Sequence, residues 1–362
     1  MFQRSITRLL PKTIKAAVFK KAGDISLDEK PMPVPKLGEA LIQITTTTIC
    51  GSDIHLRSGE TAAQVGVTVG HEPIGKVVQL GEGVTGFEVG QRVLCGAITP
   101  CGTCSSCQEG MGTQCGGPAQ GCKLGFSLDG SQAEYMIVPH ANYNLTSIPK
   151  NLTDEQVLSV PDILSTGLLG SEYGDVRVGD TVVVFAQGPI GLCAVAGARL
   201  MGATTIIAVD GLENRLEMSK KMGADHTLNY NKCNPVEEVL RLTEGRGADV
   251  AIEALGSQVT FDQALRSIKP GGRLSSLGVY AHDINVSVAM EGLAMGMSAK
   301  QVSFGLCPGG RERLRRLLNA VQSGRVNMEG LVTHRFKLDE IEKAYDLFAN
   351  QRDGVLKIAI TP

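Results

Sequence analysis

Short apolar segments separated by glycine and proline make up the first part of the chain. They lie at residues 16–19, 40–47, 75–81 and 91–95. Apolar runs of this length, bounded by turn-forming residues, predict β-strands. We therefore expect a mostly β domain between residue 15 and about residue 163.

From about residue 165 to residue 304 apolar strands alternate with helical stretches. Buried strands are indicated at residues 181–186, 204–210, 249–256 and 273–280, and helices between them at 191–202, 213–223 and 257–272. Strands that alternate with helices predict a parallel sheet with right-handed crossovers. This part is expected to be a doubly wound α/β domain.

The last part of the chain contains two amphipathic helices, at residues 311–324 and 338–351, and a final strand at 355–360. We expect this tail to return to the first domain. The 362 residues exceed what one hydrophobic core usually serves. The predicted division is a catalytic domain of residues 1–164 and 305–362 and a cofactor domain of residues 165–304.

Composition narrows the class of protein. Hydrophobic residues form 43% of the chain and charged residues 20%, which is typical of a globular protein. The formal net charge of -2 gives no attraction to nucleic acid or to anionic lipid. Because a membrane helix needs about 18 to 20 apolar residues in a row and none are present, no membrane partner is expected.

The first 15 residues contain Arg4, Arg8, Lys12 and Lys15 and no acidic residue. Such a segment resembles a mitochondrial transit peptide, although Pro11 would interrupt a longer helix. The favoured interpretation is an N-terminal arm that packs on the body or on a neighbouring subunit. The ten cysteines are too sparse for a disulfide scaffold and are clustered as for metal binding, which indicates a reducing, intracellular compartment. A cytoplasmic location is preferred, with the mitochondrial matrix as the alternative.

The strongest local motif is a run of four cysteines, Cys101, Cys104, Cys107 and Cys115. Four thiolates this close in sequence can surround one zinc ion tetrahedrally and leave no position open for substrate, so a structural zinc is predicted. The alternatives are an iron–sulfur cluster and unligated thiols. A zinc ribbon for nucleic acid is disfavoured because the run has no basic surroundings.

A second, open metal site is suggested by Cys50, followed by His71 with Glu72, at places where β-segments meet glycine-rich turns. Asp162 is the acid we choose as a third ligand. Cysteine, histidine and carboxylate leave the fourth tetrahedral position free, as in catalytic zinc sites. Taken singly, a lone cysteine or histidine is more often a packing residue.

A nucleotide-binding turn follows the strand at 181–186. The usual G-x-G-x-x-G fingerprint is present with alanine in place of its first glycine, and Gly188, Pro189, Ile190 and Gly191 lead into a helix. Asp210 ends the next strand and predicts NAD over NADP, because a carboxylate accepts ribose hydroxyls and repels a 2′-phosphate. Alternatively Asp210 is only a polar strand end, and Arg215 can pair with a phosphate.

Four features together resemble the zinc-dependent medium-chain alcohol dehydrogenases: CGSDIH at 50–55, GHEPIGKV at 70–77, the cysteine run and the nucleotide turn. PDILSTG, with its acid at Asp162, is most similar to the secondary-alcohol (isopropanol-type) enzymes, whereas the cysteine lobe departs from the bacterial members of that subgroup. The resemblance implies a GroES-like catalytic domain, a Rossmann cofactor domain and a homo-oligomer, with a tetramer favoured over a dimer.

The resemblance also assigns roles to residues. It implies Cys50, His71 and Asp162 as ligands of a catalytic zinc, with Glu72 as an exchanging ligand, and hence two zinc ions per subunit. Ser52 and His55 are implied as the proton path to solvent through the cofactor ribose. Met290, Met295 and Met297 have no such role, and core filling is preferred for them over a substrate pocket or a subunit interface.

The leading hypothesis is an NAD-linked zinc enzyme that transfers hydride between a small, secondary alcohol and its ketone. The same mechanism on a polyol, a threonine-like amino alcohol or an aldehyde stays open. A non-catalytic NAD-binding zinc protein, structural or regulatory, is the alternative from another class. The intact set of Cys50, His71, Asp162, Ser52 and His55 argues against that alternative.

Overall fold

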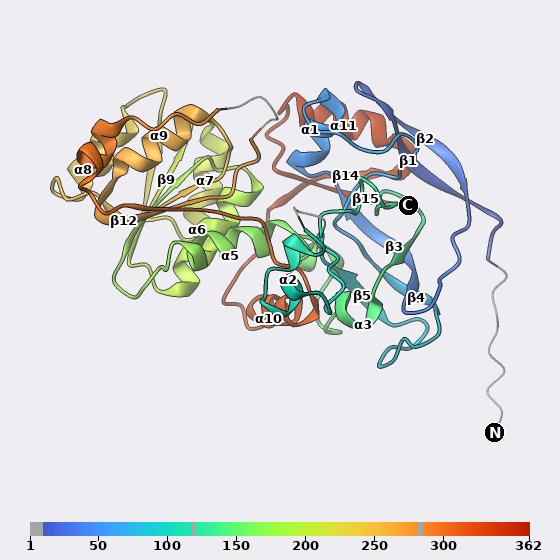
Figure 1. The fold of residues 1–362 in the computed structure, drawn as a ribbon. Helices are drawn as coiled ribbons and strands as arrows, with labels where there is room; N and C mark the ends of the chain where they lie inside the picture. Colours follow the sequence, from blue (N-terminus) through green and yellow to red (C-terminus); the bar gives the residue numbers. More distant parts are fainter. Residues whose placement is uncertain (1–9, 118–120, 281–284) are drawn as a thin grey trace.

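The computed structural model describes residues 10–117, 121–280 and 285–362. Within these ranges the strands from β3 onward form a six-stranded and a seven-stranded sheet, which lie in two domains side by side (Figure 1). A hairpin of β1 (Thr13–Lys21) and β2 (Asp24–Pro31) flanks the seven-stranded sheet. Most of the predicted N-terminal arm or transit peptide, residues 1–9, lies outside the described residues.

The seven-stranded sheet forms the core of the catalytic domain. Its order is β14-β15-β3-β4-β5-β7, and β6 also pairs with β3. The last strand of the chain, β15, pairs antiparallel with β3, so the predicted return of the tail to the first domain is confirmed. The bounds are β3 (Ala40–Thr48), β4 (Ile74–Leu80), β5 (Arg92–Cys95), β6 (Tyr135–Val138), β7 (Leu145–Ser147), β14 (Val332–Lys337) and β15 (Lys357–Thr361).

Short helices connect or cover these strands. They are α1 (Gly51–Ser58), α2 (Ser105–Gln108), α3 (Ala141–Asn144), α4 (Asp154–Val157), α10 (Arg311–Gln322) and α11 (Ile341–Ala349). The two amphipathic helices predicted for the tail correspond to α10 and α11. Leu314, Leu317 and Leu318 on one side of α10 are buried, as its periodic pattern requires.

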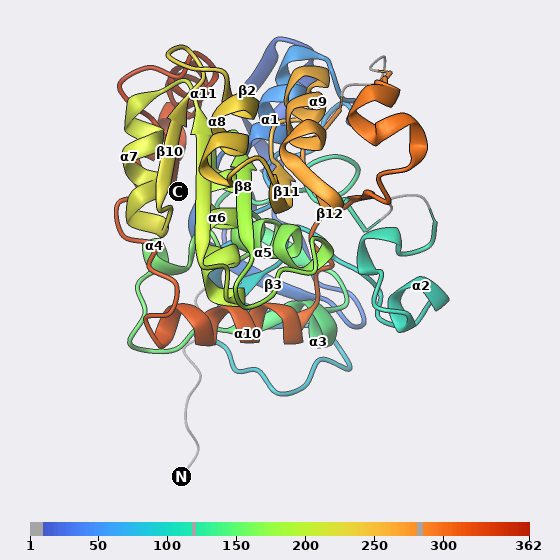
Figure 2. The ribbon, with the colours of Figure 1, turned by 90° about the vertical axis from the view of Figure 1, so that its left-hand side faces the viewer.

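The six-stranded sheet is wholly parallel, in the order β10-β9-β8-β11-β12-β13. Alternate strand residues enter different cores: Val182 and Val184 of β8 pack with α5 and α6, whereas Val183 and Phe185 pack with α8 and α9. Helices therefore cover both faces (Figure 2), and the doubly wound prediction is confirmed. The strands are β8 (Thr181–Phe185), β9 (Thr205–Asp210), β10 (His226–Asn229), β11 (Ala248–Glu253), β12 (Ile268–Ser276) and β13 (Gln301–Phe304).

The helices of this domain are α5 (Ile163–Tyr173), α6 (Pro189–Met201), α7 (Glu213–Met222), α8 (Pro235–Leu242) and α9 (Gln258–Ser267). The helix predicted at 257–272 is too long, because β12 already begins at Ile268. Pro270 disfavours helical backbone at the residue before it and cannot continue the helical hydrogen bonding.

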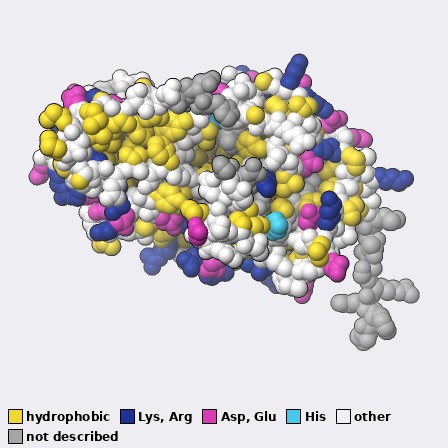
Figure 3. Space-filling view, in the orientation of Figure 1, with side chains coloured by type: hydrophobic (Ala, Val, Ile, Leu, Met, Phe, Trp, Pro, Cys, Tyr) yellow, Lys and Arg dark blue, Asp and Glu magenta, His cyan; other side chains and the backbone are white. Residues whose placement is uncertain are grey.

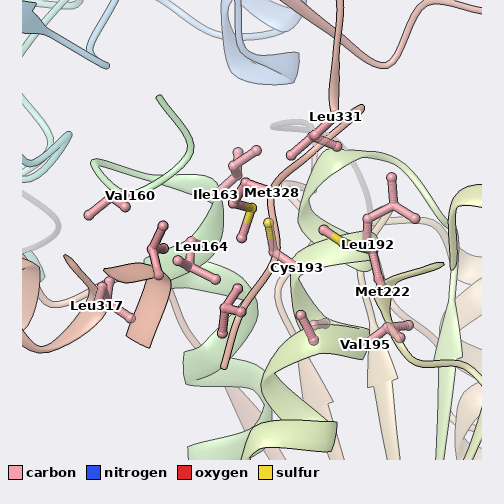
Figure 4. Close-up of a cluster of buried hydrophobic side chains, with 14 of the residues drawn as sticks. Val160, Ile163, Leu164, Leu192, Cys193, Val195, Met222, Leu317, Met328 and Leu331 are labelled. Carbon is pink, nitrogen blue, oxygen red and sulfur yellow. The ribbon is translucent and has the colours of Figure 1, made fainter. Parts of the chain in front are cut away.

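One continuous apolar core joins the two domains. It includes Ile163 and Leu164 of α5, Leu192 and Cys193 of α6, and Leu317 of α10 (Figure 4). Helix α5 lies directly on α6, since a Cβ at Gly167 would stand 2.6 Å from the backbone nitrogen of Ala194. The predicted domain boundary at residue 164 thus falls in the first turn of α5, a helix that packs in the core shared by the two domains.

Among the helices of the described ranges, none has the length and apolar character that crossing a bilayer requires.

Candidate active site

Four chemically reactive side chains from three distant segments meet in one buried cluster. Cys50 precedes α1, His71 and Glu72 precede β4, and Asp162 precedes α5. Each offers a donor atom, and these atoms lie within 4.8 Å of one another. All four residues are at most 6% exposed. The structure therefore brings together the whole set that the sequence suggested for an open metal site.

Asp162 lies at the centre of this cluster. Its Oδ2 is 3.4 Å from Cys50 Sγ and 3.4 Å from His71 Nε2. Its Oδ1 accepts a hydrogen bond from Thr166 Oγ1 at 3.0 Å, and Cys307 Sγ lies 3.7 Å away. Burial raises the pKa of Asp162, but the hydrogen bond and charge of His71 outweigh it and hold the pKa at about 2. The carboxylate is thus available as an anionic ligand.

His71 turns its other ring nitrogen toward a second buried carboxylate. Its Nδ1 is 3.6 Å from Asp53 Oδ1. Asp53 is itself fixed, since Oδ2 accepts from the backbone nitrogen of Cys50 at 2.9 Å and from Gln132 Nε2 at 3.3 Å. Burial lowers the pKa of His71, yet the facing Asp53 charge and the hydrogen bond to Asp162 leave it well above the ordinary value. Such a carboxylate orients a ligating imidazole.

Glu72 keeps one oxygen free at the cluster. Lys357 Nζ lies 2.6 Å from its Oε1, and both residues are at most 1% exposed. Its Oε2 is buried without a hydrogen-bond partner in the described chain. Burial raises the pKa of Glu72 to about 7, although the Lys357 charge opposes this. A buried, half-satisfied carboxylate fits an exchanging ligand.

The donor set and its spacing fit zinc. Thiolate, imidazole and carboxylate are the ligands zinc takes in catalytic sites, at about 2.0 to 2.3 Å from the ion, which places tetrahedral donors about 3.3 to 3.8 Å apart. The two separations of 3.4 Å to Asp162 lie in that range. Cys50, His71 and Asp162 can therefore hold one zinc ion, and Glu72 can supply or vacate the fourth position.

Ser52 and His55 occupy opposite ends of the proposed proton path. Ser52 Oγ lies 3.4 Å from His71 Nε2, inside the cluster. His55 follows three residues later on the same side of α1. Its side chain is 33% exposed, and its Nδ1 is 2.5 Å from Glu60 Oε2. Ser52 therefore contacts the metal cluster, and His55 reaches solvent.

Several neighbours of the cluster were missed by the sequence reasoning: Asp53, Thr166, Cys307 and Lys357. Lys357 did leave a signal, because it is a single charge inside an otherwise apolar predicted strand. Thr166 follows Asp162 by one helical turn. Cys307 had no local signal, since a segment far along the chain brings it to Asp162.

The four-cysteine run forms a second cluster in a separate lobe. The Sγ atoms of Cys101, Cys104, Cys107 and Cys115 lie within 4.8 Å of one another, with 3.4 Å between Cys104 and Cys107 and 3.9 Å between Cys101 and Cys107. Zinc–thiolate bonds of about 2.3 Å place tetrahedral sulfurs about 3.8 Å apart. All ten cysteines are free of disulfide bonds. The lobe therefore fits a closed zinc site.

Hydrogen bonds prepare the sulfur of Cys101 for a metal. The hydroxyl and backbone nitrogen of Thr103 and the backbone nitrogen of Cys104 donate to Cys101 Sγ, each at 3.4 Å. They lower the pKa of Cys101 to about 5, so this thiol is readily deprotonated. The lobe also contacts the catalytic cluster indirectly, because Thr113 Oγ1 donates to the carbonyl oxygen of Cys307 at 2.8 Å.

Replacing Cys104 by serine is expected to remove one zinc per chain and lower the melting temperature by at least about 5 °C, because a structural zinc contributes folding energy. Metal analysis and a thermal melt measure both effects. Ser105→Ala, an exposed position in the same lobe, is the control. An unchanged zinc content would contradict the structural site, and iron in the purified protein would contradict the choice of zinc.

The nucleotide turn lies between β8 and α6. Ala186, in place of the first fingerprint glycine, still adopts the left-handed backbone with φ 69°. A Cβ at Gly188 would meet nothing within 4 Å, whereas one at Gly191 would stand 1.8 Å from the carbonyl oxygen of Ala186. Gly188 thus leaves room for a pyrophosphate, and Gly191 permits close packing of helix on strand.

The start of α6 completes this turn. Gly188 caps the helix, Pro189 occupies its first turn, and Ile190 packs against the joint core. Proline suits this position because no intrahelical hydrogen bond is lost there. The remaining free N–H groups and the helix dipole favour a bound phosphate.

The carboxylate of Asp210, at the end of β9, is held by backbone hydrogen bonds. Its Oδ2 accepts a hydrogen bond from the backbone nitrogen of Gln187 at 2.7 Å, and its Oδ1 accepts from Gly211 and Leu212 at 2.8 and 2.9 Å. These contacts fix the carboxylate beside the nucleotide turn. Arg215 NH1 lies 3.7 Å from the same carboxylate, so its charge faces Asp210.

Comparison with known proteins places this geometry in a family. An alcohol dehydrogenase GroES-like domain model matches residues 36–150, and a zinc-binding dehydrogenase model matches residues 189–323. An alcohol dehydrogenase from Cupriavidus necator is 54% identical over 96% of this chain and 99% of its own length. The chain belongs to the zinc-dependent medium-chain alcohol dehydrogenases. The predicted family, the GroES-like domain and the Rossmann domain are thereby confirmed.

Two further similarities bear on this alcohol dehydrogenase. A protein from Thermoanaerobacter brockii, named NADP-dependent isopropanol dehydrogenase, is 36% identical over 95% of this chain and 98% of its own. A zinc-dependent alcohol dehydrogenase from Streptococcus pneumonia has a TM-score of 0.88 at 36% identity, covering 96% and 98% of the two chains. The protein is an oxidoreductase that interconverts small alcohols and ketones, using zinc and a nicotinamide cofactor.

Proposed function

We propose that this alcohol dehydrogenase transfers hydride between small secondary alcohols and NAD, at a zinc ion held by Cys50, His71 and Asp162. The observation that carries the proposal is the buried cluster of these three residues, whose donor atoms have zinc spacing. The name of the Thermoanaerobacter brockii relative, an isopropanol dehydrogenase, supports a secondary alcohol as substrate. A second zinc in the four-cysteine lobe is part of the proposal.

The surrounding residues orient the ligands and move a proton. When bound, zinc supplies a Lewis acid that favours loss of the substrate hydroxyl proton. Ser52 Oγ, next to His71 Nε2, accepts that proton, and His55 with Glu60 delivers it to solvent. Thr166 and Asp53 hold Asp162 and His71 in place. Glu72, whose buried Oε2 has no hydrogen-bond partner in the described chain, would be the fourth ligand of the zinc when no substrate is bound.

The choice of NAD rests on Asp210. Its fixed carboxylate lies at the end of β9, where the adenosine ribose of a dinucleotide binds in doubly wound folds. The two residues after it, Gly211 and Leu212, offer no positive side chain for a 2′-phosphate. Arg215 is already directed at Asp210. A carboxylate in this place favours ribose hydroxyls over phosphate.

A steady-state screen of small primary and secondary alcohols, polyols, threonine and the matching ketones and aldehydes, with NAD(H) and NADP(H), tests the proposal. The expected result is the highest kcat/KM for a secondary alcohol or its ketone with NAD(H). A preference for threonine, a polyol or an aldehyde would contradict the proposed substrate class but would leave the proposed zinc site unchanged. Absence of turnover in the zinc-loaded protein would contradict the catalytic proposal.

We also propose a homo-oligomer, a tetramer rather than a dimer as the family resemblance implies, with one of its interfaces at the edge of the cofactor sheet. β13 is the last strand of that sheet, and its Val302 and Phe304 are 41% and 56% exposed. Hydrophobic side chains gather over the half of the molecule that α8, α9 and β12 occupy (Figure 3). An exposed apolar edge strand pairs readily with a second copy of itself across a two-fold axis.

The methionines near this edge support an interface. Met290, Met295 and Met297 are 53%, 76% and 74% exposed, so the core-filling interpretation is wrong. They lie in a 3₁₀ segment, Met290–Gly296, and directly after it, where no core reaches them. Apolar side chains that stay on the surface together are typical of subunit contacts.

Val302→Lys is expected to lower the molar mass in solution, measured by light scattering, because a buried lysine in a paired edge strand is disfavoured. Val178→Lys is the control, since Val178 is 86% exposed and precedes β8, which β11 and β12 separate from β13 in the sheet. An unchanged mass for Val302→Lys would contradict this interface. A monomeric wild-type protein would contradict the oligomer itself.

A further inference from the structure

A buried carboxylate outside the metal cluster joins two loops at the edge of the cofactor sheet. Glu253, the last residue of β11, is 0% exposed. Its Oε1 accepts hydrogen bonds from the backbone nitrogens of Leu255 and Gly256, both at 2.8 Å, and from Thr260 Oγ1 at 2.7 Å. Its Oε2 accepts from Ser276 Oγ at 2.9 Å and Tyr280 OH at 3.2 Å.

All five of these donors are neutral. A buried anion without a cationic partner is costly to desolvate, and five neutral donors offset that cost. The carboxylate also lies ahead of α9, whose N-terminal dipole favours a negative charge. Such a cluster fits one geometry, because its donors come from the two loops, from helix α9 at Thr260 and from the end of β12 at Ser276.

The position of Glu253 in the sheet is level with the nucleotide turn. It pairs with Phe185, the residue just before Ala186, and on its other side with Ser276 of β12. Strands β8 and β11 are neighbours in the sheet although they are far apart in sequence, which makes this the topological switch point. In open α/β sheets ligands bind in the crevice outside the carboxyl ends of the strands at that point.

The two loops that Glu253 joins touch through their backbones. A Cβ at Gly256 would stand 2.3 Å from the carbonyl oxygen of Val279, and one at Gly278 would stand 1.9 Å from the backbone nitrogen of Gly256. We call residues 254–256 and 277–280 together the Glu253 wall. Leu255 and Val279 expose 53% and 39% of their surfaces from this wall. It therefore presents apolar surface beside the crevice.

We propose that Glu253 is a positioning residue for the nicotinamide half of the cofactor. Asp210 on β9 marks the adenosine half, and the start of α6 after β8 marks the pyrophosphate. A dinucleotide that continues across the sheet from β9 and β8 reaches β11 and β12 next, where the Glu253 wall lies. Glu253 acts through the wall and touches no reacting atom.

This inference rests on a nicotinamide dinucleotide in the crevice and applies to NAD and NADP alike. A result that contradicts the role of Glu253 can therefore be distinguished from a result that contradicts the proposed substrate or the proposed preference for NAD. Binding of NADH and of AMP to the zinc-loaded full-length wild-type protein establishes the reference affinities. AMP reports the adenosine half alone, and the comparison of the two ligands isolates the nicotinamide half.

Glu253→Ala is expected to weaken NADH binding at least about tenfold, measured by fluorescence titration, and to change AMP affinity, measured by calorimetry, less than about twofold. Glu253→Gln is expected to restore NADH affinity to within about threefold of wild type. Its amide oxygen still accepts from Leu255 and Gly256, and the Ser276 hydroxyl can turn to accept from its amide nitrogen.

Asp249→Asn is the matched control. Asp249 is a buried carboxylate of the same strand at its opposite end, where it accepts a hydrogen bond from the backbone nitrogen of Thr181 at 2.8 Å. This variant is expected to lower the melting temperature and to leave the NADH-to-AMP affinity ratio unchanged. A purely structural role for Glu253 would give the same pattern as this control.

Two outcomes would overturn the proposal: wild-type NADH affinity in folded Glu253→Ala, or equal losses of NADH and AMP affinity. If Glu253→Ala does not fold, the double variant Ser276→Ala with Tyr280→Phe removes only the donors to Oε2. It is expected to weaken NADH binding about threefold or more with AMP affinity unchanged. Unchanged NADH affinity in that variant would equally overturn it.

Discussion

Replacement of Cys50 by serine is expected to lower kcat/KM for a secondary alcohol by at least about a thousandfold. A bound zinc contributes several kcal/mol of transition-state stabilisation, and each 1.4 kcal/mol corresponds to about a factor of ten. Cys50 provides the sulfur of the proposed ligand set, 3.4 Å from Asp162 Oδ2 and 112 residues before it in the chain. A serine hydroxyl is a poor zinc ligand, so the ion should be lost.

Steady-state kinetics and metal analysis measure this prediction together. Zinc content should fall from two ions per chain to one, because the four-cysteine lobe remains intact. Cys233→Ser serves as the control: its thiol donates a hydrogen bond to the carbonyl oxygen of Asn229 and belongs to neither metal cluster. Full activity of Cys50→Ser, or retention of both zinc ions, would contradict the assignment of the catalytic site.

Replacement of Asp210 by serine is expected to reduce the ratio of kcat/KM with NAD to kcat/KM with NADP by about a hundredfold. Two effects act in the same direction. Charge-assisted hydrogen bonds to the ribose, about 1.5 to 3 kcal/mol each, are lost for NAD, and repulsion of the 2′-phosphate is removed for NADP. Arg215, whose NH1 is 3.7 Å from Asp210 in the wild type, is then free to face a phosphate.

The serine variant should also lose some activity with NAD itself, since the Asp210 carboxylate accepts three backbone hydrogen bonds that shape the nucleotide turn. The ratio between cofactors is therefore the decisive quantity. Glu217→Gln, on the exposed side of α7 and paired only with Lys220, is the control for the loss of one negative charge. Equal use of both cofactors by the wild-type enzyme would disprove the NAD preference.

The metal clusters differ in how far local sequence specifies them. The four cysteines of the lobe occupy 15 consecutive residues, from Cys101 to Cys115, so short spacers alone bring their sulfurs together. The nucleotide turn is similar, because strand, turn and helix follow directly. Even there the chain departs from the pattern: Ala186 adopts φ 69°, a conformation that the usual glycine takes more easily.

Errors in the sequence reasoning came from properties that neighbours decide. The helix predicted at 257–272 ends at Ser267, because β12 takes over the residues before and after Pro270. The three methionines were expected in a core, yet the edge of the sheet leaves them on the surface. Apolar character indicates burial against something, but it does not indicate whether the partner is the same chain.

The sequence by itself determined the two-domain α/β architecture, the cysteine lobe and the nucleotide turn, because periodic burial and short-range spacing are properties of a local stretch of chain. The sequence also suggested Cys50, His71 and Asp162 as one ligand set through its family resemblance, and the tertiary structure shows that they meet. Only the tertiary structure decided that Lys357 reaches Glu72 across 285 residues and that Glu253 joins two loops. Those contacts depend on how the strands are ordered and packed, and local sequence does not encode that order.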